Sequence, residues 1–314
     1  MKLSIVATLY QSAPYINEFH ERASATARRL VGDDYEIVLV NDGSPDESLA
    51  LALQLQSRDC HVQVVELSRN FGHHAAIVAG LAQARGDQIF LIDSDLEEQP
   101  EWLLQFAEKM EASGADVVFG VQQGRVASFW SNFSGELFWS ALNFLSSTPI
   151  PHNPMTCRLM RRCYVDALLE VGDRVLYLAG TFAWTGFKQM AIPLMKTPRP
   201  ILHKSTYDLS RKLMQVADSF SSFSIAPLSL IFFAGLLIWF GSVLFGLGLV
   251  IRKLIEPDMV LTGFTSIMLS IWFLGGSIIL VLGVLGMYVG KIFQEVKRRP
   301  LYIIKNIYKG KDIG

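Results

Sequence analysis

The chain has 314 residues, enough for one complete α/β domain and a smaller additional part at about 100–200 residues per domain. Its formal net charge is −1, and we expect no nucleic-acid partner. The three cysteines, Cys60, Cys157 and Cys163, are an odd number without metal-type spacing. They indicate buried thiols in a reducing compartment, and they exclude a disulfide framework.

The first 120 residues alternate short β-forming runs with helical patterns. We predict helices over residues 14–30, 46–58, 72–85 and 101–113. We predict strands over residues 3–9, 37–40, 62–67, 88–92 and 117–120. Apolar strands separated by helices are typical of βαβ units. The sequence therefore predicts an α/β fold with a mostly parallel, Rossmann-like sheet, in a globular domain that spans residues 1–203.

Two long uncharged runs, 219–251 and 259–290, follow this domain. Each exceeds the ~20 residues that a helix needs to cross a bilayer, so we predict transmembrane helices at 223–251 and 259–290. An amphipathic pattern over 204–222 predicts a helix in the membrane interface. The alternative for this segment is an ordinary amphipathic helix packed on the domain.

Basic residues are unevenly placed around the two predicted spans. Residues 291–314 carry seven Lys and Arg, whereas the short loop 252–258 carries only Arg252 and Lys253. The positive-inside rule therefore places both flanks in the cytosol and the loop outside. The N-terminus lacks a secretion signal, so we expect a multi-pass plasma-membrane protein with its globular domain and both termini in the cytosol. The basic tail 291–314 should lie against anionic lipid headgroups.

Asp93-Ser94-Asp95 follows an apolar run at residues 89–92. Ligands bind beyond the carboxyl ends of parallel strands, and alternate residues of an extended chain point the same way. Asp93 and Asp95 are therefore expected to face one site. Two carboxylates beside substrate phosphates are a usual way to hold Mg²⁺ or Mn²⁺. The acidic Glu97 and Glu98 follow closely, and the alternative interpretation is a turn or a helix cap.

Other polar residues follow the second and third predicted strands. Asp42 is a candidate for contacts with a base or ribose, unless residues 41–45 are merely a turn with an Asx cap. Arg69 opens a predicted helix, where it suits a phosphate group. We interpret His73 and His74 as capping or surface residues, because adjacent side chains on a helix diverge. The absence of GxGxxG and Walker motifs disfavours dinucleotide or ATP binding of those types.

The chain resembles family 2 inverting glycosyltransferases, and more closely their polyprenyl-phosphate branch. The runs that carry this resemblance lie at residues 36–46, 67–72, 79–87 and 93–96, with further matches at 134–145, 185–186, 223–228 and 295–302. The branch includes dolichol-phosphate mannose synthases and bacterial undecaprenyl-phosphate glucosyl- and aminoarabinosyltransferases. The resemblance covers nearly the whole chain, and it implies an enzyme at the cytosolic face of the bacterial inner membrane.

On the donor side, the resemblance implies that Asp42 contacts the nucleoside, and the position of Arg69 at a helix start makes it a candidate for the phosphates. Tyr10 belongs to the run Thr-Leu-Tyr-Gln-Ser at residues 8–12, which stands where the family usually has Pro-x-Tyr-Asn-Glu. The edge that recognises the base is therefore altered, although we still expect Tyr10 to contact the nucleotide. The expected donor is a nucleotide sugar, with a UDP-sugar favoured.

On the metal and acceptor side, Asp93 and Asp95 match the pair that binds the cation and the diphosphate. Glu97 stands where the family usually has a metal-side glutamine. Arg125 falls in the loop whose basic residues meet the acceptor phosphate, and Arg158 matches an arginine of a later motif. The resemblance thus assigns catalysis to Asp93, Asp95, Arg125 and Arg158, with Mg²⁺ or Mn²⁺ as cofactor.

These features predict metal-dependent, inverting transfer of a sugar to a polyprenyl phosphate such as undecaprenyl phosphate. Such a phosphate has a second pKa near ~6 and is already a nucleophile at pH 7, so Thr156 in place of a common aspartate need not abolish the chemistry. One alternative is transfer to a hydroxyl of a lipid-linked saccharide, with Glu97 or Glu98 as the base. A non-catalytic membrane scaffold is another. Relatives often assemble through the membrane helices and tail, which adds a homo-oligomer to the expected partners.

Overall fold

The computed structural model describes residues 1–123, 153–173, 178–196 and 263–309, together with five single positions between 235 and 255. The chain divides into two compact units. The first unit takes in Met1–Ser140, Thr148–Tyr207 and Arg299–Gly314, and the second takes in Ala141–Ser147 and Asp208–Arg298. The predicted interfacial helix at 204–222 and nearly all of the predicted span at 223–251 lie outside the described residues.

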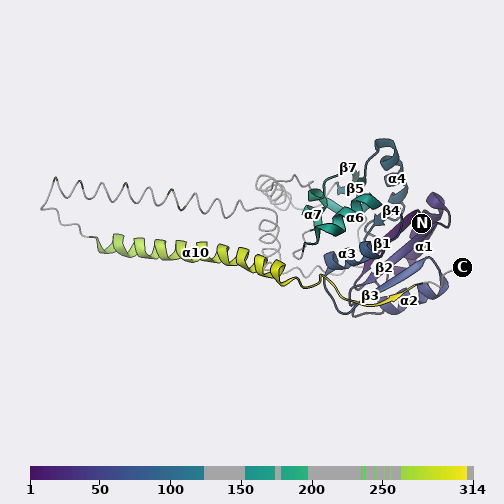
Figure 1. Ribbon diagram of the computed structural model, residues 1–314, viewed down its shortest axis with the longest axis horizontal. Helices are drawn as coiled ribbons and strands as arrows, with labels where there is room; N and C mark the ends of the chain where they lie inside the picture. The colour runs from purple at the N-terminus through teal and green to yellow at the C-terminus, as the bar shows by residue number, and fades with distance from the viewer. Residues whose placement is uncertain are drawn as a thin grey trace. The chain divides into compact units, whose positions relative to one another are not determined.

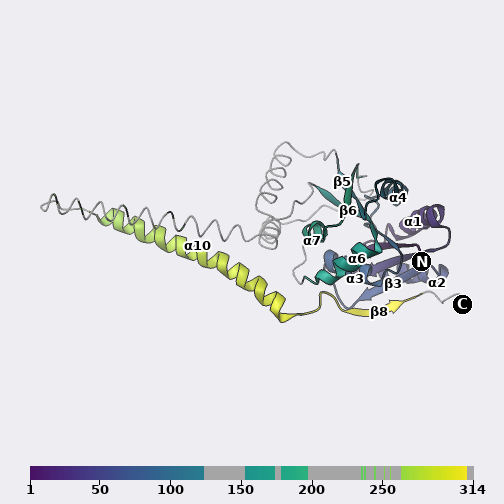
Figure 2. The same ribbon diagram turned by 45° about the horizontal axis from the view of Figure 1, so that its top comes forward.

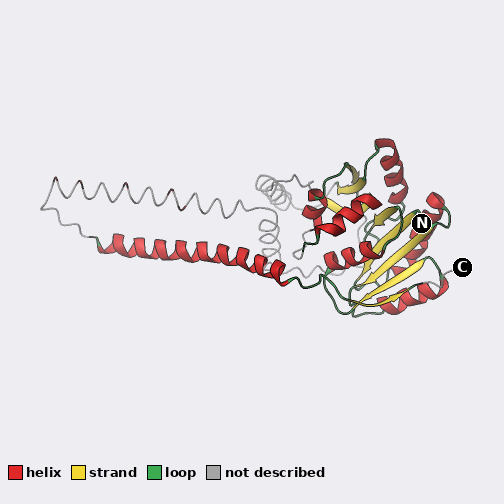
Figure 3. Ribbon diagram, in the orientation of Figure 1, coloured by secondary structure: helices red, strands yellow, loops and turns green. Residues whose placement is uncertain are grey.

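An eight-stranded sheet organises the first unit (Figures 1 and 3). Its strands are β1 (Leu3–Leu9), β2 (Tyr35–Asn41), β3 (Val62–Leu67), β4 (Gln88–Leu91), β5 (Val117–Gln122), β6 (Pro154–Arg161), β7 (Gln189–Leu194) and β8 (Ile304–Tyr308). Their order across the sheet is β7-β5-β6-β4-β1-β2-β3-β8. Only β6 and β8 run antiparallel to their neighbours among these strands. The predicted α/β class with a mostly parallel sheet is confirmed.

Helices cover both faces of this sheet. One face carries α1 (Ile16–Val31), α2 (Ser48–Arg58) and α4 (Trp102–Ser113), and the other carries α3 (His73–Gln83), α6 (Arg162–Val171) and α7 (Leu178–Trp184). Successive side chains of β1 alternate between the two cores, with Ile5 in one and Val6 in the other. Burial on both faces explains why the strands read as continuous apolar runs, and at roughly 25 cal/mol per Å² it is the main stabilising contribution.

The strands predicted in the first 120 residues all form, and β1 and β3 have the predicted bounds. We did not predict β6, β7 or β8 from the sequence.

The prediction of buried thiols is correct for one cysteine, because Cys157 in β6 is buried. Cys60 and Cys163 are exposed, so the prediction of buried thiols is wrong for these two residues.

The C-terminal strand β8 closes one edge of the sheet by pairing antiparallel with β3 (Figure 2). Glu66 of β3 accepts hydrogen bonds from Lys305 Nζ at 2.6 Å, Asn306 Nδ2 at 2.9 Å and Tyr308 Oη at 2.9 Å. We expected the segment 291–314 to be a basic tail on lipid headgroups. Within it, residues 304–308 are instead a structural part of the globular unit.

The second unit contains the long helix α10 (Phe264–Lys297), which continues past the predicted end of the second span at Gly290. The most apolar 18-residue stretch of its segment Leu274–Lys297 has a mean hydropathy of 1.9, and by length and composition the segment could cross a membrane. It is the only such helix in the part of the chain that the structure describes. Apolar side chains such as Ile278, Leu282 and Val289 are exposed along it, which is the surface that a lipid-facing helix presents.

Candidate active site

Four strands bring polar side chains to the carboxyl edge of the sheet. Tyr10 follows β1, Asp42 follows β2, Asp93 lies two residues beyond β4, and Lys196 lies two residues beyond β7. These four strands all run in the same direction, as their pairing shows. Their carboxyl ends therefore meet at one edge, which is where open α/β sheets bind ligands.

Asp42 is a buried carboxylate that organises the loop after β3. Its side chain accepts hydrogen bonds from the backbone N–H of Phe71 at 2.7 Å and of Gly72 at 3.0 Å. Burial raises the pKa of Asp42, although these two amides act in the opposite direction. The adjacent Gly43 has φ +60°, and a Cβ there would lie 2.5 Å from the backbone nitrogen of Asn70. The β2 turn and the β3 loop can pack this closely because this position is glycine.

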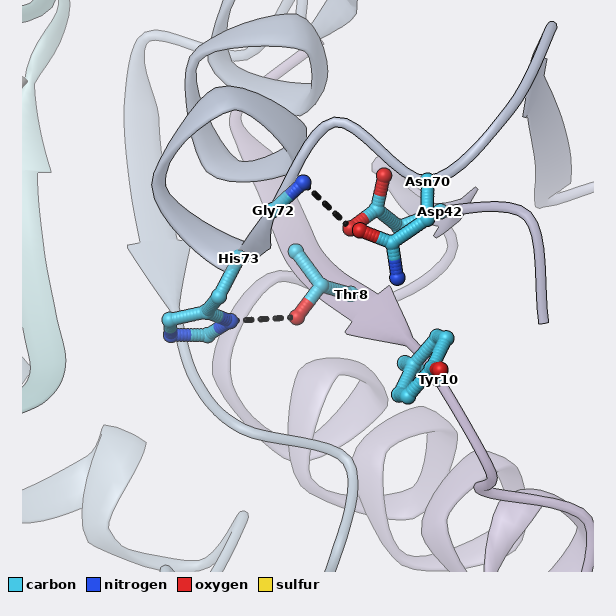
Figure 4. A pocket seen from close by; sticks show the side chains of 6 residues that line it. All are labelled: Thr8, Tyr10, Asp42, Asn70, Gly72 and His73. Carbon is cyan, nitrogen blue, oxygen red and sulfur yellow. Dashed lines mark hydrogen bonds between the residues drawn. The ribbon is translucent and has the colours of Figure 1, made fainter. Parts of the chain in front are cut away.

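A cavity of about 100 Å³ opens beside Asp42 (Figure 4). It is lined by Thr8, Tyr10, Asp42, Asn70, Gly72 and His73. Tyr10 and Asp42, both of which we predicted to contact the nucleotide, are thus brought together. Arg69 is not among the lining residues. Its guanidinium lies 4.0 Å from the centre of the Phe71 ring and donates a hydrogen bond to the carbonyl oxygen of Asn70.

The acidic run that follows β4 alternates in exposure. Asp93, Asp95 and Glu97 are partly exposed, whereas Ser94 and Glu98 between and after them are buried. The backbone N–H of Glu97 donates to Asp95 Oδ1 at 3.1 Å, which fixes that carboxylate within the loop. The run is a turn and not an extended chain, with φ +61° at Leu96, and it leaves the three predicted metal ligands more exposed than Ser94 and Glu98.

Glu98 and Lys196 form a charged pair behind this run. The Glu98 side chain has no exposed surface, and its Oε1 lies 3.3 Å from Lys196 Nζ, which also lies 3.7 Å from Glu97 Oε2. Burial, together with the neighbouring Asp93, raises the pKa of Glu98 to about 7. Burial likewise raises the pKa of Asp93 to about 6, against the lowering effect of Lys196. The ammonium of Lys196 is therefore shared among several carboxylates.

His73 is exposed, as predicted for a surface residue, and its side chain also lines the cavity beside Asp42. Its ring is 44% exposed, but it points into the site and makes no helix cap. Nδ1 lies 3.1 Å from Thr8 Oγ1, and Nε2 lies 3.5 Å from Asp93 Oδ1. Our prediction used the divergence of His73 and His74 on the helix, and it did not include the neighbours of His73 on other elements.

Arg158 lies on β6 beside a second cavity, of about 140 Å³. Its guanidinium stacks 3.4 Å from the centre of the Phe182 ring and donates to the carbonyl oxygens of Thr156 and Met155. Burial lowers the pKa of Arg158 to about 10, so this side chain remains a cation at neutral pH. Arg125, the other arginine predicted to meet the acceptor, lies outside the described residues.

Comparison with known proteins identifies the family and the fold. A family model described as "Glycosyl transferase family 2" matches residues 4–169, which include every site residue described above on β1 to β6. The chain belongs to glycosyl transferase family 2. A Mycobacterium tuberculosis protein named as a glycosyltransferase is 42% identical over 313 residues, which is 100% of this chain and 90% of the relative.

Two further relatives of this glycosyltransferase carry more specific names. The "SfII prophage-derived bactoprenol glucosyl transferase" of Shigella flexneri is 32% identical over 312 residues, covering 99% of each protein. The "prophage bactoprenol glucosyl transferase homolog" of Escherichia coli K12 is 32% identical over 311 residues, covering 98% of this chain and 100% of the relative.

A solved structure shares the fold. It is a mannosyltransferase from Pyrobaculum calidifontis in complex with GDP-Man and Mn²⁺, with a TM-score of 0.50 and 19% identity. The similarity covers 70% of this chain and 63% of that one. At this identity it shows that the glycosyltransferase has a GT-A, Rossmann-like domain, and it assigns no residue roles.

The residues of the acidic run suit a divalent cation. Mg²⁺ and Mn²⁺ take oxygen ligands, and Asp93, Asp95 and Glu97 supply three partly exposed carboxylates in one short run. They are not gathered as tightly as Asp59, Cys60 and His61, which form the one described group of three ligand-type side chains within 4.8 Å of one another. That group lies at the amino end of β3, on the opposite edge of the sheet.

Proposed function

We propose that this glycosyltransferase moves a sugar from a nucleotide-sugar donor to a polyprenyl phosphate, with a divalent cation and with inversion at the anomeric carbon. The observation that carries the proposal is the acidic run Asp93–Glu98 beside the cavity of Asp42, at the carboxyl edge of a GT-A sheet. The bactoprenol names of two relatives that match the chain over its full length support the acceptor class.

The donor nucleotide would lie in the cavity with Tyr10 and Asp42. Both oxygens of Asp42 already bind backbone amides, so its main contribution is to shape the loop against which the nucleoside packs. A carboxylate oxygen has more than one acceptor position, which leaves room for a ribose hydroxyl or base N–H. A UDP-sugar remains the favoured donor, and Arg69 would need to leave the Phe71 ring to reach its phosphates.

Asp93, Asp95 and Glu97 would hold the cation, Mg²⁺ or Mn²⁺. When bound, the cation stabilises the negative charge that develops on the departing diphosphate. The chain's own contribution is to keep these carboxylates ionised and correctly placed. Lys196 assists because its ammonium, paired with the buried Glu98, lowers the pKa of Asp93.

The acceptor phosphate requires no strong base. A phosphate monoester with a second pKa near ~6 is largely dianionic at pH 7. One of its oxygens forms the new bond to the anomeric carbon while the bond from that carbon to the donor diphosphate breaks on the opposite face. Arg158, and Arg125 from the loop, would attract and orient this phosphate. Direct displacement of this kind inverts the anomeric centre.

The reaction would take place at the cytosolic surface of the bacterial inner membrane. The exposed apolar surface of α10 supports membrane attachment, and the uncharged run 223–251 would provide the other span of a multi-pass protein. In this arrangement the segment 204–222 would lie in the interface, at the depth of the acceptor's phosphate. Assembly into a homo-oligomer remains part of the proposal.

A transfer assay with the full-length protein tests the proposal. The purified protein in lipid would receive undecaprenyl phosphate, Mn²⁺ and a panel of radiolabelled nucleotide sugars, with Asp95→Asn as the matched variant. We expect a chloroform-soluble labelled product that disappears with EDTA and with Asp95→Asn. This result would also identify the donor.

Two other outcomes would overturn the proposed acceptor. Donor hydrolysis without any lipid product, across a panel that covers the plausible donors, would favour a saccharide hydroxyl as acceptor. If the protein shows neither sugar transfer nor metal-dependent hydrolysis of the donor, the result would favour the non-catalytic scaffold.

A further inference from the structure

His73 lines two cavities of the site, the first of which is shown in Figure 4. It lines the cavity that contains Asp42 and Tyr10, and it also lines the cavity beside Arg158. Under the proposed function these cavities belong to the donor nucleotide and to the acceptor phosphate. The reacting sugar would therefore pass close to the His73 ring.

Both nitrogens of this ring have partners. Nδ1 lies 3.1 Å from Thr8 Oγ1, and Nε2 lies 3.5 Å from Asp93 Oδ1. A neutral imidazole has one donor and one acceptor nitrogen, and an ionised carboxylate can only accept. A neutral ring with its hydrogen on Nε2 would direct that hydrogen at Asp93 and leave Nδ1 to accept the hydroxyl hydrogen of Thr8.

The backbone also holds His73 in place. It is the first residue of α3, and the two residues before it, Phe71 and Gly72, donate their amide hydrogens to Asp42. The 3.5 Å separation from Asp93 is at the outer limit of a hydrogen bond. Such contacts are often long without ligand and shorten in the substrate complex.

We propose that His73 is a positioning residue, whose Nε2–H holds one oxygen of Asp93 so that this carboxylate is aimed at the divalent cation and the donor diphosphate. The inference rests on the proposed function and adds a residue to it. Outer-shell partners of metal ligands orient those ligands, and removing one typically weakens metal binding about 10–100-fold. The ring acts through Asp93 and transfers no proton in the reaction.

The test measures Mn²⁺ binding to the full-length protein in detergent, from the electron paramagnetic resonance signal of free Mn²⁺. We expect His73→Ala to weaken Mn²⁺ binding about tenfold and to lower kcat more than it raises KM for the acceptor. His73→Gln keeps an N–H donor and should recover most of the affinity. His20→Ala is the matched control, because it removes another histidine–carboxylate pair, 2.8 Å from Asp59, on a different part of the domain.

The outcomes separate this inference from the proposed function. Wild-type Mn²⁺ affinity in His73→Ala would overturn the inference while leaving the proposed function intact. Equal weakening in His73→Ala and His73→Gln would also overturn it, because the donated N–H would then be irrelevant. If the wild-type protein itself fails to bind Mn²⁺, the proposed metal dependence fails, and the inference fails with it.

Discussion

Asp42 and Asp93 occupy equivalent places on either side of β1, yet their surroundings differ. Each follows a parallel strand that pairs with β1, and burial raises the pKa of both carboxyls. Asp42 is 2% exposed and binds two backbone amides, so its polar atoms are satisfied within the fold. Asp93 is 22% exposed and lies among other acids, with Lys196 as the compensating cation.

This difference shows how one residue type serves two purposes at the same edge of a sheet. A carboxylate whose hydrogen bonds are complete stabilises a loop and changes little when a ligand arrives. A carboxylate held among like charges gains most from a cation, because the cation removes an existing repulsion. We therefore expect substitutions at Asp42 to affect mainly stability, and substitutions at Asp93 to affect mainly activity.

The largest expected effect is on catalysis. Asp93→Asn keeps the shape of the side chain but removes a charge, and we expect the rate of sugar transfer to fall about 100-fold or more. The midpoint of thermal unfolding should stay the same or rise, since a repulsive charge is lost. Initial rates and a melting curve of the full-length protein provide the measurement. If Asp93→Asn is destabilised yet nearly fully active, Asp93 would act as we expect of Asp42, which would contradict our comparison.

The second effect concerns stability. Asp42→Ala leaves the amides of Phe71 and Gly72 without an acceptor, and each unsatisfied buried group costs about 1–3 kcal/mol. We expect the free energy of unfolding to fall by about 2–4 kcal/mol, with a smaller loss in Asp42→Asn, which keeps one acceptor oxygen. Denaturant unfolding of both variants measures this. Equal stability of Asp42→Ala and wild type would show that the loop does not depend on Asp42.

The third effect is a pH dependence that should be specific to the acidic run. Burial raises the pKa of Glu98 from 4.5 to about 7, so the folded protein binds a proton more tightly than the unfolded chain does. Stability from this group is therefore present below pH 4.5 and is lost as the pH rises to about 7. We expect Glu98→Gln to flatten this decline, in melting curves recorded between pH 5 and 8 without divalent cation. A wild-type midpoint of thermal unfolding that rises between pH 5 and 8, and rises less in Glu98→Gln, would contradict the raised pKa of Glu98.

The smallest effect should appear at the edge where β8 pairs with β3. Glu66→Ala removes the acceptor shared by Lys305, Asn306 and Tyr308. We expect faster protease cleavage of the C-terminal segment with little change in the transfer rate, and limited proteolysis followed by mass spectrometry measures it. Unchanged cleavage would mean that the backbone pairing alone holds the strand.

The sequence was most informative where the structure is local. The strands β1 to β5 alternate with helices in chain order, so their apolar runs predicted them, and the aspartates at their ends followed from the topology. Lys196 could not be found in this way. It comes from β7, which enters the sheet far from its sequence neighbours, and a single lysine after a short apolar strand has no distinctive pattern.

The contacts of His73 and the strand β8 were missed for the same physical reason. The ring of His73 lies close to Thr8 and Asp93, which are distant in sequence, whereas our interpretation used only its neighbour on the helix. The β8 segment reads as a basic tail until its partner Glu66 is known. A better signal was available for His73, because it follows Gly72 at the start of a helix on the carboxyl edge.

The pairing of β8 with β3 also sets an order of events during synthesis. At about 5–20 residues per second, residue 304 is made roughly 10–50 s after residue 67, so β3 has an open edge throughout that interval. Open strand edges invite pairing with other chains, and a charged side chain is a common defence. Glu66, which later anchors β8, stands on that edge from the beginning. The same carboxylate would thus first protect the unfinished sheet and then help to complete it.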